Sequence, residues 1–166
     1  VNHWPSKYGG SKKTIPLRAA AASTLRSHVE AILADDPAAE VVVMGDLNDE
    51  PDEASVAEHL GAMLDLELVG KDGHILWNVM EPWHKNPQGS TYMYAGKHMV
   101  YDHLIVSPGL TDEQGLRLVE NSVGVFDGDK YRQHDGKYDG YPFRFWAGNR
   151  LLGGYSDHMP VYLSIE

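Results

Sequence analysis

Two polar side chains follow an apolar run in the first third of the chain. Asp46 and Asn48 stand two residues apart in "GDLND", directly after the apolar residues 41–44. A short turn at the end of a strand can point both side-chain oxygens the same way, and open α/β sheets bind ligands at the carboxyl ends of strands. Asp and Asn are also favoured turn formers, so the same residues can close the strand with an Asx-turn. The segment therefore indicates either a ligand site or a plain turn.

Asp102, Asp157 and His158 stand in two further segments that border apolar runs. Asp157 and His158 belong to "SDH", and Asp102 to "VYDHLIVS" at 100–107. If the latter is a strand, alternation places Asp102 on one face and His103 on the other. A carboxylate buried without a partner costs several kcal/mol, so Asp102 needs an imidazolium unless it lies at the solvated end of the strand. We interpret His103 as structural, and the "SDH" segment as either a solvated loop or part of a site.

Hydrophobic periodicity predicts the elements that must position these residues. Helical spacing across 14–34, with Pro16 suited to the first turn, predicts a long helix. Its buried face is expected to contain Leu17, Ala21, Leu25, Val29, Ile32 and Leu33. A strand at 41–44 and a short helix at 51–60, ended by Gly61, should follow. Further strands are expected at 75–79, 90–94, 99–107, 121–126 and 160–165, with a long loop between the last two.

Composition narrows the class of protein. The chain has 166 residues, 42% of them hydrophobic, and no linker divides it, so we expect one domain over 1–166. The lack of cysteine excludes disulfides and leaves the compartment open, including a periplasmic or secreted location. No apolar run reaches the roughly 20 residues of a membrane span, so we expect a soluble protein. A net charge of −10 disfavours a non-specific nucleic-acid binder, because affinity for a phosphate backbone comes mainly from Lys and Arg.

Taken in order, the segments "NHW", "GDLND", "YDHLIVS" and "GGYSDHMPV" resemble the second half of the endonuclease/exonuclease/phosphatase superfamily, which contains the DNase I-like nucleases. Each segment is short, but the ordered set spans nearly the whole chain. The resemblance implies a four-layer α/β sandwich of the DNase I-like type, of which this chain supplies the C-terminal half. It also implies a divalent-metal phosphoesterase site at the ends of the sheets.

The resemblance implies a role for each matching residue. Asp46 and Asn48 match the pair that contacts the attacking water and the scissile phosphate. His158 matches a histidine that contacts the phosphate or acts as general acid or base, and Asp102 matches the aspartate that orients it. An aspartate in that place fixes the tautomer of the imidazole and favours its charged form. His3 would donate to a phosphate oxygen or to the leaving group.

Asp157 matches the metal-binding aspartate of the superfamily. The implied cofactor is Mg²⁺ or Mn²⁺, with Ca²⁺ as a third option, because these hard cations prefer oxygen ligands. The superfamily's metal-binding glutamate belongs to its N-terminal half, upstream of His3, and Glu40, Glu50 and Glu53 do not stand in a matching context. We therefore expect the metal site to be incomplete without that N-terminal half.

Three groups of residues border the motifs. Three lysines follow His3 in a Gly-rich segment, where they either receive the substrate anion or form a solvated loop: Lys7, Lys12 and Lys13. Aromatic residues before "SDH" either form a wall of the substrate pocket or anchor the loop to the core: Tyr138, Tyr141, Phe143, Phe145 and Trp146. The other histidines are interpreted as surface or packing residues: His28, His59, His74, His84, His98 and His134.

Two functions from different classes remain open. The first is a divalent-metal-dependent phosphoesterase that hydrolyses a phosphodiester or phosphomonoester by attack of water, with an Asp–His acid/base pair. The negative charge favours a small or lipid substrate over duplex DNA. The second is a non-catalytic interaction module, or an inactive fragment, that keeps the fold. Besides the substrate, we expect the N-terminal half or a second copy of the chain as a partner, because a C-terminal half alone would leave an apolar sheet face uncovered.

Overall fold

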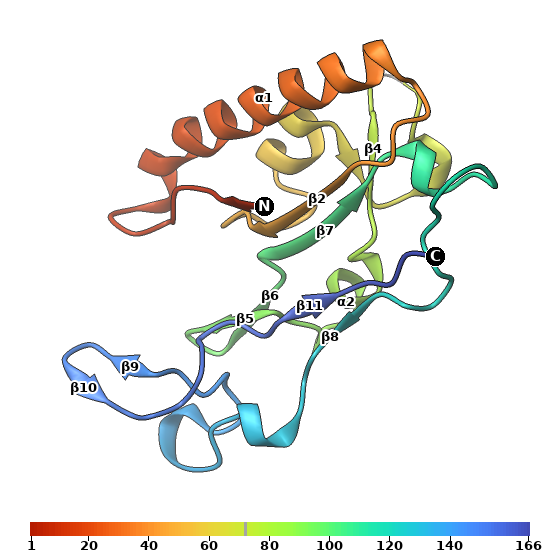
Figure 1. Ribbon diagram of the computed structural model, residues 1–166. Coiled ribbons are helices and arrows are strands. Elements are labelled where there is room, and N and C mark those ends of the chain that lie inside the picture. Colours follow the sequence, from red (N-terminus) through yellow and green to blue (C-terminus); the bar gives the residue numbers. More distant parts are fainter. Residues whose placement is uncertain (72) are drawn as a thin grey trace.

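A five-stranded mixed sheet forms the centre of this computed structural model, which describes residues 1–71 and 73–166 (Figure 1). In the order in which they lie side by side, its strands are β1 (Asn2–His3), β2 (Val42–Asp46), β7 (Asp102–Val106), β4 (Leu76–Asn78) and β3 (Ala62–Met63). The pairs β1–β2 and β3–β4 are parallel and the other pairs are antiparallel. The predicted α/β class with a mixed sheet is confirmed, and it agrees with a DNase I-like fold.

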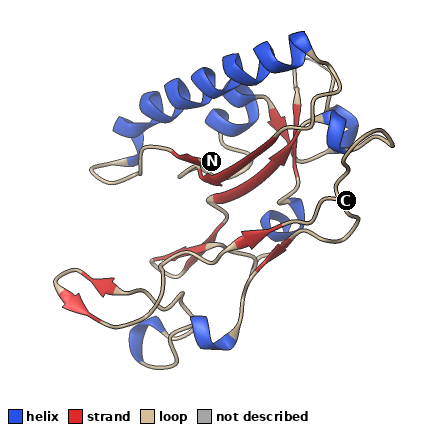
Figure 2. Ribbon diagram, in the orientation of Figure 1, coloured by secondary structure: helices blue, strands red, loops and turns tan. Residues whose placement is uncertain are grey.

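The long helix α1 (Ser11–Asp35) covers one face of this sheet (Figure 2). It confirms the helix predicted at 14–34, but the expected buried face was wrong at Leu17 and Ile32, which are 55% and 38% exposed, whereas Arg18 beside Leu17 is fully buried. An arginine is normally assigned to the solvent face. Arg18 lies on the buried face because its guanidinium pairs with the carboxylate of Asp49. No helix in the described part of the chain has the length and apolar character to cross a membrane.

The opposite face of the sheet packs against short strands from later in the chain. Leu104 of β7 belongs to an apolar cluster that also contains Val125 and Val161. The strands on this side form two-stranded sheets: β5 (Tyr92–Tyr94) with β6 (Lys97–Met99), β8 (Gly124–Val125) with β11 (Val161–Tyr162), and β9 (Trp146–Ala147) with β10 (Arg150–Leu151). The central sheet therefore has helix on one face and β-structure on the other.

The predicted strand at 99–107 is interrupted. It is divided between β6 and β7, because the backbone amides between them bind side chains instead of a neighbouring strand. The N–H of Val100 donates to Glu50 Oε1 at 2.9 Å, and the N–H of Tyr101 donates to Thr91 Oγ1 at 3.0 Å. The contact with Glu50 holds the start of β7 close to the turn that follows β2, and the contact with Thr91 holds it beside the start of β5.

Short helical turns make up most of the remaining regular structure. They are η1 (Ser55–Leu60), η2 (Leu66–Leu68), α2 (Glu81–Lys85), η3 (Pro108–Leu110), η4 (Asp129–Tyr131) and η5 (Gly136–Tyr138). The helix predicted at 51–60 is shorter and π-helical, and it ends as predicted at Gly61, which has a φ of 77°. The predicted long loop contains η4, η5 and the β9–β10 hairpin, which projects from the rest of the chain in Figure 1.

The register of the sheet brings three of the motif residues to one edge. Parallel pairing of β1 with β2 places His3 beside Asp46, and antiparallel pairing of β2 with β7 places Asp46 opposite Asp102. The same edge therefore carries an imidazole and two carboxylates from three distant segments.

Candidate active site

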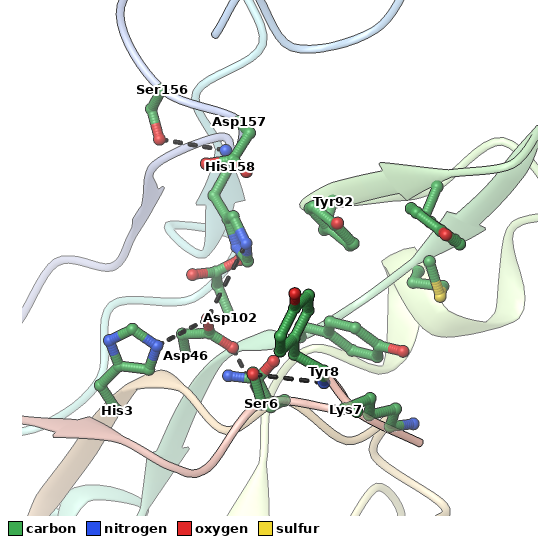
Figure 3. Close-up of a pocket in the computed structure, with 15 residues that line it drawn as sticks. His3, Ser6, Lys7, Tyr8, Asp46, Tyr92, Asp102, Ser156, Asp157 and His158 are labelled. Carbon is green, nitrogen blue, oxygen red and sulfur yellow. Dashed lines mark hydrogen bonds and ion pairs between the residues drawn. The ribbon is translucent and has the colours of Figure 1, made fainter. Parts of the chain in front are cut away.

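A cavity of about 820 Å³ opens where β1 and β2 end and β7 begins (Figure 3). It is lined by all the residues that the motifs single out for catalysis or metal binding: His3, Asp46, Asn48, Asp102, Asp157 and His158. These residues come from four separate segments of the sequence, so the structure brings them together as the resemblance implies. The role of each residue stays a prediction.

Asp102 and His158 form a hydrogen-bonded pair. His158 Nδ1–H donates to Asp102 Oδ2 at 2.6 Å, which leaves Nε2 facing the cavity. Tyr92 stacks on the imidazole, with 4.6 Å between the ring centroids. Burial alone would lower the pKa of His158, but the hydrogen bond and the charges of Asp102, Asp46 and Asp157 outweigh burial and raise that pKa above its ordinary value. The pair therefore favours an imidazolium in the cavity.

The two carboxylate oxygens of Asp46 have different partners. Oδ1 accepts the backbone N–H of Asn48 at 2.9 Å, which makes the Asx-turn that the sequence allows. Oδ2 lies 3.8 Å from His158 Nε2 and 3.5 Å from His3 Nε2. Burial raises the pKa of Asp46, although the charge of His158 and the amide of Asn48 oppose the shift. Asp46 therefore closes the Asx-turn with one carboxylate oxygen and faces the two imidazoles with the other. We call Asp46, Asp102 and His158 the His158 cluster.

Asn48 and His3 complete this side of the cavity. Asn48 has a φ of 53°, in the left-handed region that asparagine tolerates better than most residues. Its Nδ2 donates to the carbonyl of Trp4 at 3.1 Å, which ties the turn after β2 to the end of β1. The side chain of His3 is 75% exposed and lies at the rim. The site therefore has a hydrogen-bonded turn at its floor and one exposed imidazole at its rim.

A family model described as the Endonuclease/Exonuclease/phosphatase family matches residues 1–166. The chain belongs to this family. Its membership confirms the resemblance carried by the four motifs and suggests a phosphoesterase or nuclease activity. Among curated proteins and solved structures, none matches the chain.

In this family member, the turn after β2 also buries a second carboxylate, Asp49. Its Oδ2 lies 2.6 Å from Arg18 Nε and accepts the hydroxyl of Ser55, and its Oδ1 lies 3.0 Å from Lys7 Nζ. Burial would raise the pKa of Asp49, but Arg18, Ser55 and Lys7 together lower it. We call these four residues the Asp49 network. It joins α1, the segment after β1 and η1, and so holds the turn that carries Asp46 and Asn48.

The positive patch predicted from Lys7 and Lys12 does not form in the cavity. Lys7 lines the cavity, but its ammonium lies 2.6 Å from Glu53 in addition to the contact with Asp49. Lys12 lies in the first turn of α1 and is not one of the lining residues. A lysine so fully paired has little charge left for a substrate anion, because the neighbouring carboxylates already neutralise it.

The aromatic residues of the loop before "SDH" do not form a wall of this cavity, since none of the five predicted candidates lines it. One of them anchors the loop instead. The hydroxyl of Tyr141 accepts the backbone N–H of Gly96, in the turn between β5 and β6. Phe145 and Trp146 remain exposed near the β9–β10 hairpin.

The predicted metal ligand, Asp157, lines the cavity with an exposed side chain. Together with Asp46 and Asp102 it offers the carboxylate oxygens that Mg²⁺ and Mn²⁺ prefer. Within residues 1–71 and 73–166, however, Asp157 belongs to no group of three or more ligand side chains whose atoms all lie within 4.8 Å of one another. The cavity therefore offers the right type of donor for a hard divalent cation, but too few donors lie close together to hold one.

Sequence reasoning missed one compact group of ligand side chains outside the cavity, formed by Glu50, Asp52 and His84. His84 had been interpreted as a surface or packing residue. Its Nδ1 lies 3.8 Å from Glu50 and its Nε2 lies 3.7 Å from Asp52. Burial raises the pKa of Glu50. No spacing in the sequence links His84 to Glu50. His84 belongs to α2, and this helix lies beside the turn at Glu50 only in the folded chain.

Proposed function

We propose that this endonuclease/exonuclease/phosphatase-family protein hydrolyses a phosphodiester or phosphomonoester with the help of a divalent cation. Support comes from the His158 cluster, whose side chains are separated by 2.6 Å and 3.8 Å within one cavity of a family member. Hydrolysis of a phosphate ester needs a proton acceptor for water and positive charge near the phosphate oxygens. Asp46 and the imidazolium of His158 can supply these two requirements.

We propose a separate task for each side chain. In phosphoryl transfer the attacking and leaving oxygens lie roughly in line, on opposite sides of phosphorus. Asp46 and His158 lie side by side, so they cannot serve these two oxygens separately. We therefore assign the proton of the attacking water to Asp46, whose pKa is raised by burial. His158 Nε2–H then donates to a non-bridging phosphate oxygen, and Asp102 holds the ring in place.

Attack of water on phosphorus releases the ester oxygen. The water oxygen forms a bond to phosphorus as its proton passes to Asp46 Oδ2. The bond from phosphorus to the ester oxygen breaks, and the leaving oxygen takes a proton from solvent. His3, at the rim, donates to a second phosphate oxygen. Asn48 contributes by fixing the turn, since its side chain is bound to Trp4.

A bound Mg²⁺ or Mn²⁺ would supply neutralisation of phosphate charge and help for the leaving oxygen. We propose Asp157 as its ligand in this chain and a carboxylate of the N-terminal half as a second. A groove of about 580 Å³ on the β-covered side of the sheet, lined by Trp77, Val79 and Leu110, offers apolar surface for that half. A second copy of the chain is the alternative occupant.

The test is the turnover of bis(p-nitrophenyl) phosphate by the full-length protein. We expect turnover that depends on Mg²⁺ or Mn²⁺, is lost with a chelator, and falls by on the order of 10²-fold in Asp46→Asn, the scale of losing a general base. Asp139→Asn, an exposed aspartate outside the cavity, is the matched control and should leave turnover unchanged. Equal turnover in Asp46→Asn and the wild type would remove Asp46 from the reaction, and a wild type without metal-dependent turnover would favour the non-catalytic interaction module.

A further inference from the structure

The cavity has an aromatic side that the proposed reaction does not use. Tyr8, Tyr92, Tyr94 and Tyr101 line it together with Met99, and we call these five residues the tyrosine wall. In Figure 3, Tyr8 and Tyr92 lie on the other side of the cavity from His3. The wall thus faces the space into which the organic part of a phosphate ester would extend from the His158 cluster.

The members of the tyrosine wall fall into two kinds. Tyr92 is already packed, because it stacks on His158 and also on Tyr101, with ring centroids 5.6 Å apart. Tyr8 and Tyr94 are 93% and 65% exposed. Two large rings that line a cavity and remain so exposed leave their apolar faces available to a ligand. Aromatic rings prefer to pair with other rings, in stacked or edge-to-face arrangements.

The charges of the cavity restrict the ligand further. Among the described residues that line it, Lys7 is the only lysine or arginine, and Asp49 and Glu53 already pair with it. Three aspartates, Asp46, Asp102 and Asp157, line the same space. A second phosphate group would therefore meet carboxylates without a free cation to bind it. This arrangement disfavours polyphosphorylated substrates and nucleic-acid backbones, which rely on several cationic contacts.

We infer that the substrate carries a single phosphate group joined to a flat, uncharged ring, and that this ring packs against Tyr8 and Tyr94. The inference rests on the proposed function, since it takes the His158 cluster as the place of the phosphate. A volume of about 820 Å³ suits a ligand of this size, because pockets for compact organic molecules lie in the range of about 300 to 1,000 Å³. The exposed rings favour a planar group over an alkyl chain.

Binding of phosphonates, which are not hydrolysed, tests the inference without a need for turnover. Phenylphosphonate, cyclohexylphosphonate and methylphosphonate are titrated into the protein with Mg²⁺, and Kd is measured from the NMR signals of His158. We expect phenylphosphonate to bind about 2- to 12-fold more tightly than cyclohexylphosphonate, the range that corresponds to a ring–ring contact of about 0.5–1.5 kcal/mol. Benzene-1,4-diphosphonate should bind no more tightly than phenylphosphonate.

Variants separate the tyrosine wall from the phosphate site. In Tyr8→Ala/Tyr94→Ala the preference for phenyl over cyclohexyl should disappear, while methylphosphonate binds as in the wild type. Tyr138→Ala, which removes an exposed tyrosine outside the cavity, should keep the preference. Equal Kd values for phenyl and cyclohexyl in the wild type, or a preference that survives in the double variant, would overturn the inference alone. Failure of all phosphonates to perturb His158 would overturn the phosphate site, and the inference with it.

Discussion

Asp46 and Asp49 belong to one turn, yet the fold gives the two carboxylates opposite surroundings. Asp49 is buried with Arg18, Lys7 and Ser55 around it, and its pKa is lowered. Asp46 lines the cavity beside His158, and its pKa is raised by burial. The charge of Asp49 is neutralised by other side chains, so Asp49 stabilises the structure. Asp46 lies beside an imidazole in an open cavity, so it is available to a ligand. The Asp49 network should therefore control stability and the His158 cluster should control chemistry.

The largest effect is expected from the Asp49 network. Arg18→Met removes the main cation beside Asp49 and should lower the free energy of unfolding by about 3–5 kcal/mol, the cost of leaving a buried charge without its partner. Urea denaturation measures this change. Arg117→Met is the control, because the exposed pair of Arg117 with Glu166 should contribute at most about 1 kcal/mol. Similar losses in the two variants would show that Arg18 does not hold the turn.

A smaller and more local effect is expected within the His158 cluster. Asp102→Asn removes the carboxylate that accepts the proton of His158 Nδ1, so the pKa of His158 should fall below its wild-type value. NMR titration of the imidazole follows this directly. Asp49→Asn, in the same turn as Asp46 but outside the cavity, should leave the pKa of His158 nearly unchanged. Equal shifts of the pKa of His158 in both variants would show that Asp49 affects the imidazole as strongly as Asp102 does.

The two histidines around Asp102 should respond to pH in opposite senses. Burial lowers the pKa of His103 from 6.5 to about 4, so the unfolded chain takes up a proton between these values that the folded chain does not. Stability should therefore fall as pH drops from about 6.5 to about 4, and less so in His103→Gln.

The raised pKa of His158 has the reverse consequence. Its contribution to stability is complete below the unfolded pKa of about 6.5 and is lost as pH rises through the folded pKa. Urea midpoints recorded from pH 4 to 8 for the wild type, His103→Gln and His158→Gln measure both windows. Parallel curves for the three proteins would contradict the contrast between the buried and the cavity histidine.

The order of the motifs in the sequence was enough to predict the catalytic candidates of the cavity, because Asp46 ends one recognisable apolar run and Asp102 and His158 begin two others. The Asp49 network was not predictable in the same way. Helical periodicity assigns Arg18 to solvent, and only the packing of α1 against the turn after β2 shows that it meets Asp49.

Long-range contacts between side chains and backbone explain the other differences. The break between β6 and β7 depends on Glu50 and Thr91, which are distant in sequence from the amides they bind. The tyrosine wall likewise combines Tyr8 with a hairpin more than eighty residues later. Local sequence patterns predict helices and strands, but they do not show which side chains come into contact when these helices and strands pack together.

The turnover of His158→Ala tests most directly whether the His158 cluster carries the proposed metal-dependent hydrolysis of a phosphate ester. The measurement is Mg²⁺- or Mn²⁺-dependent hydrolysis of bis(p-nitrophenyl) phosphate by the full-length protein, alongside urea denaturation of the same variant. We predict turnover lower by on the order of 10²-fold, the scale of losing one hydrogen-bond donor to the charge that develops in the reaction, with stability close to that of the wild type at pH 8. Unchanged turnover in a folded His158→Ala protein would contradict it.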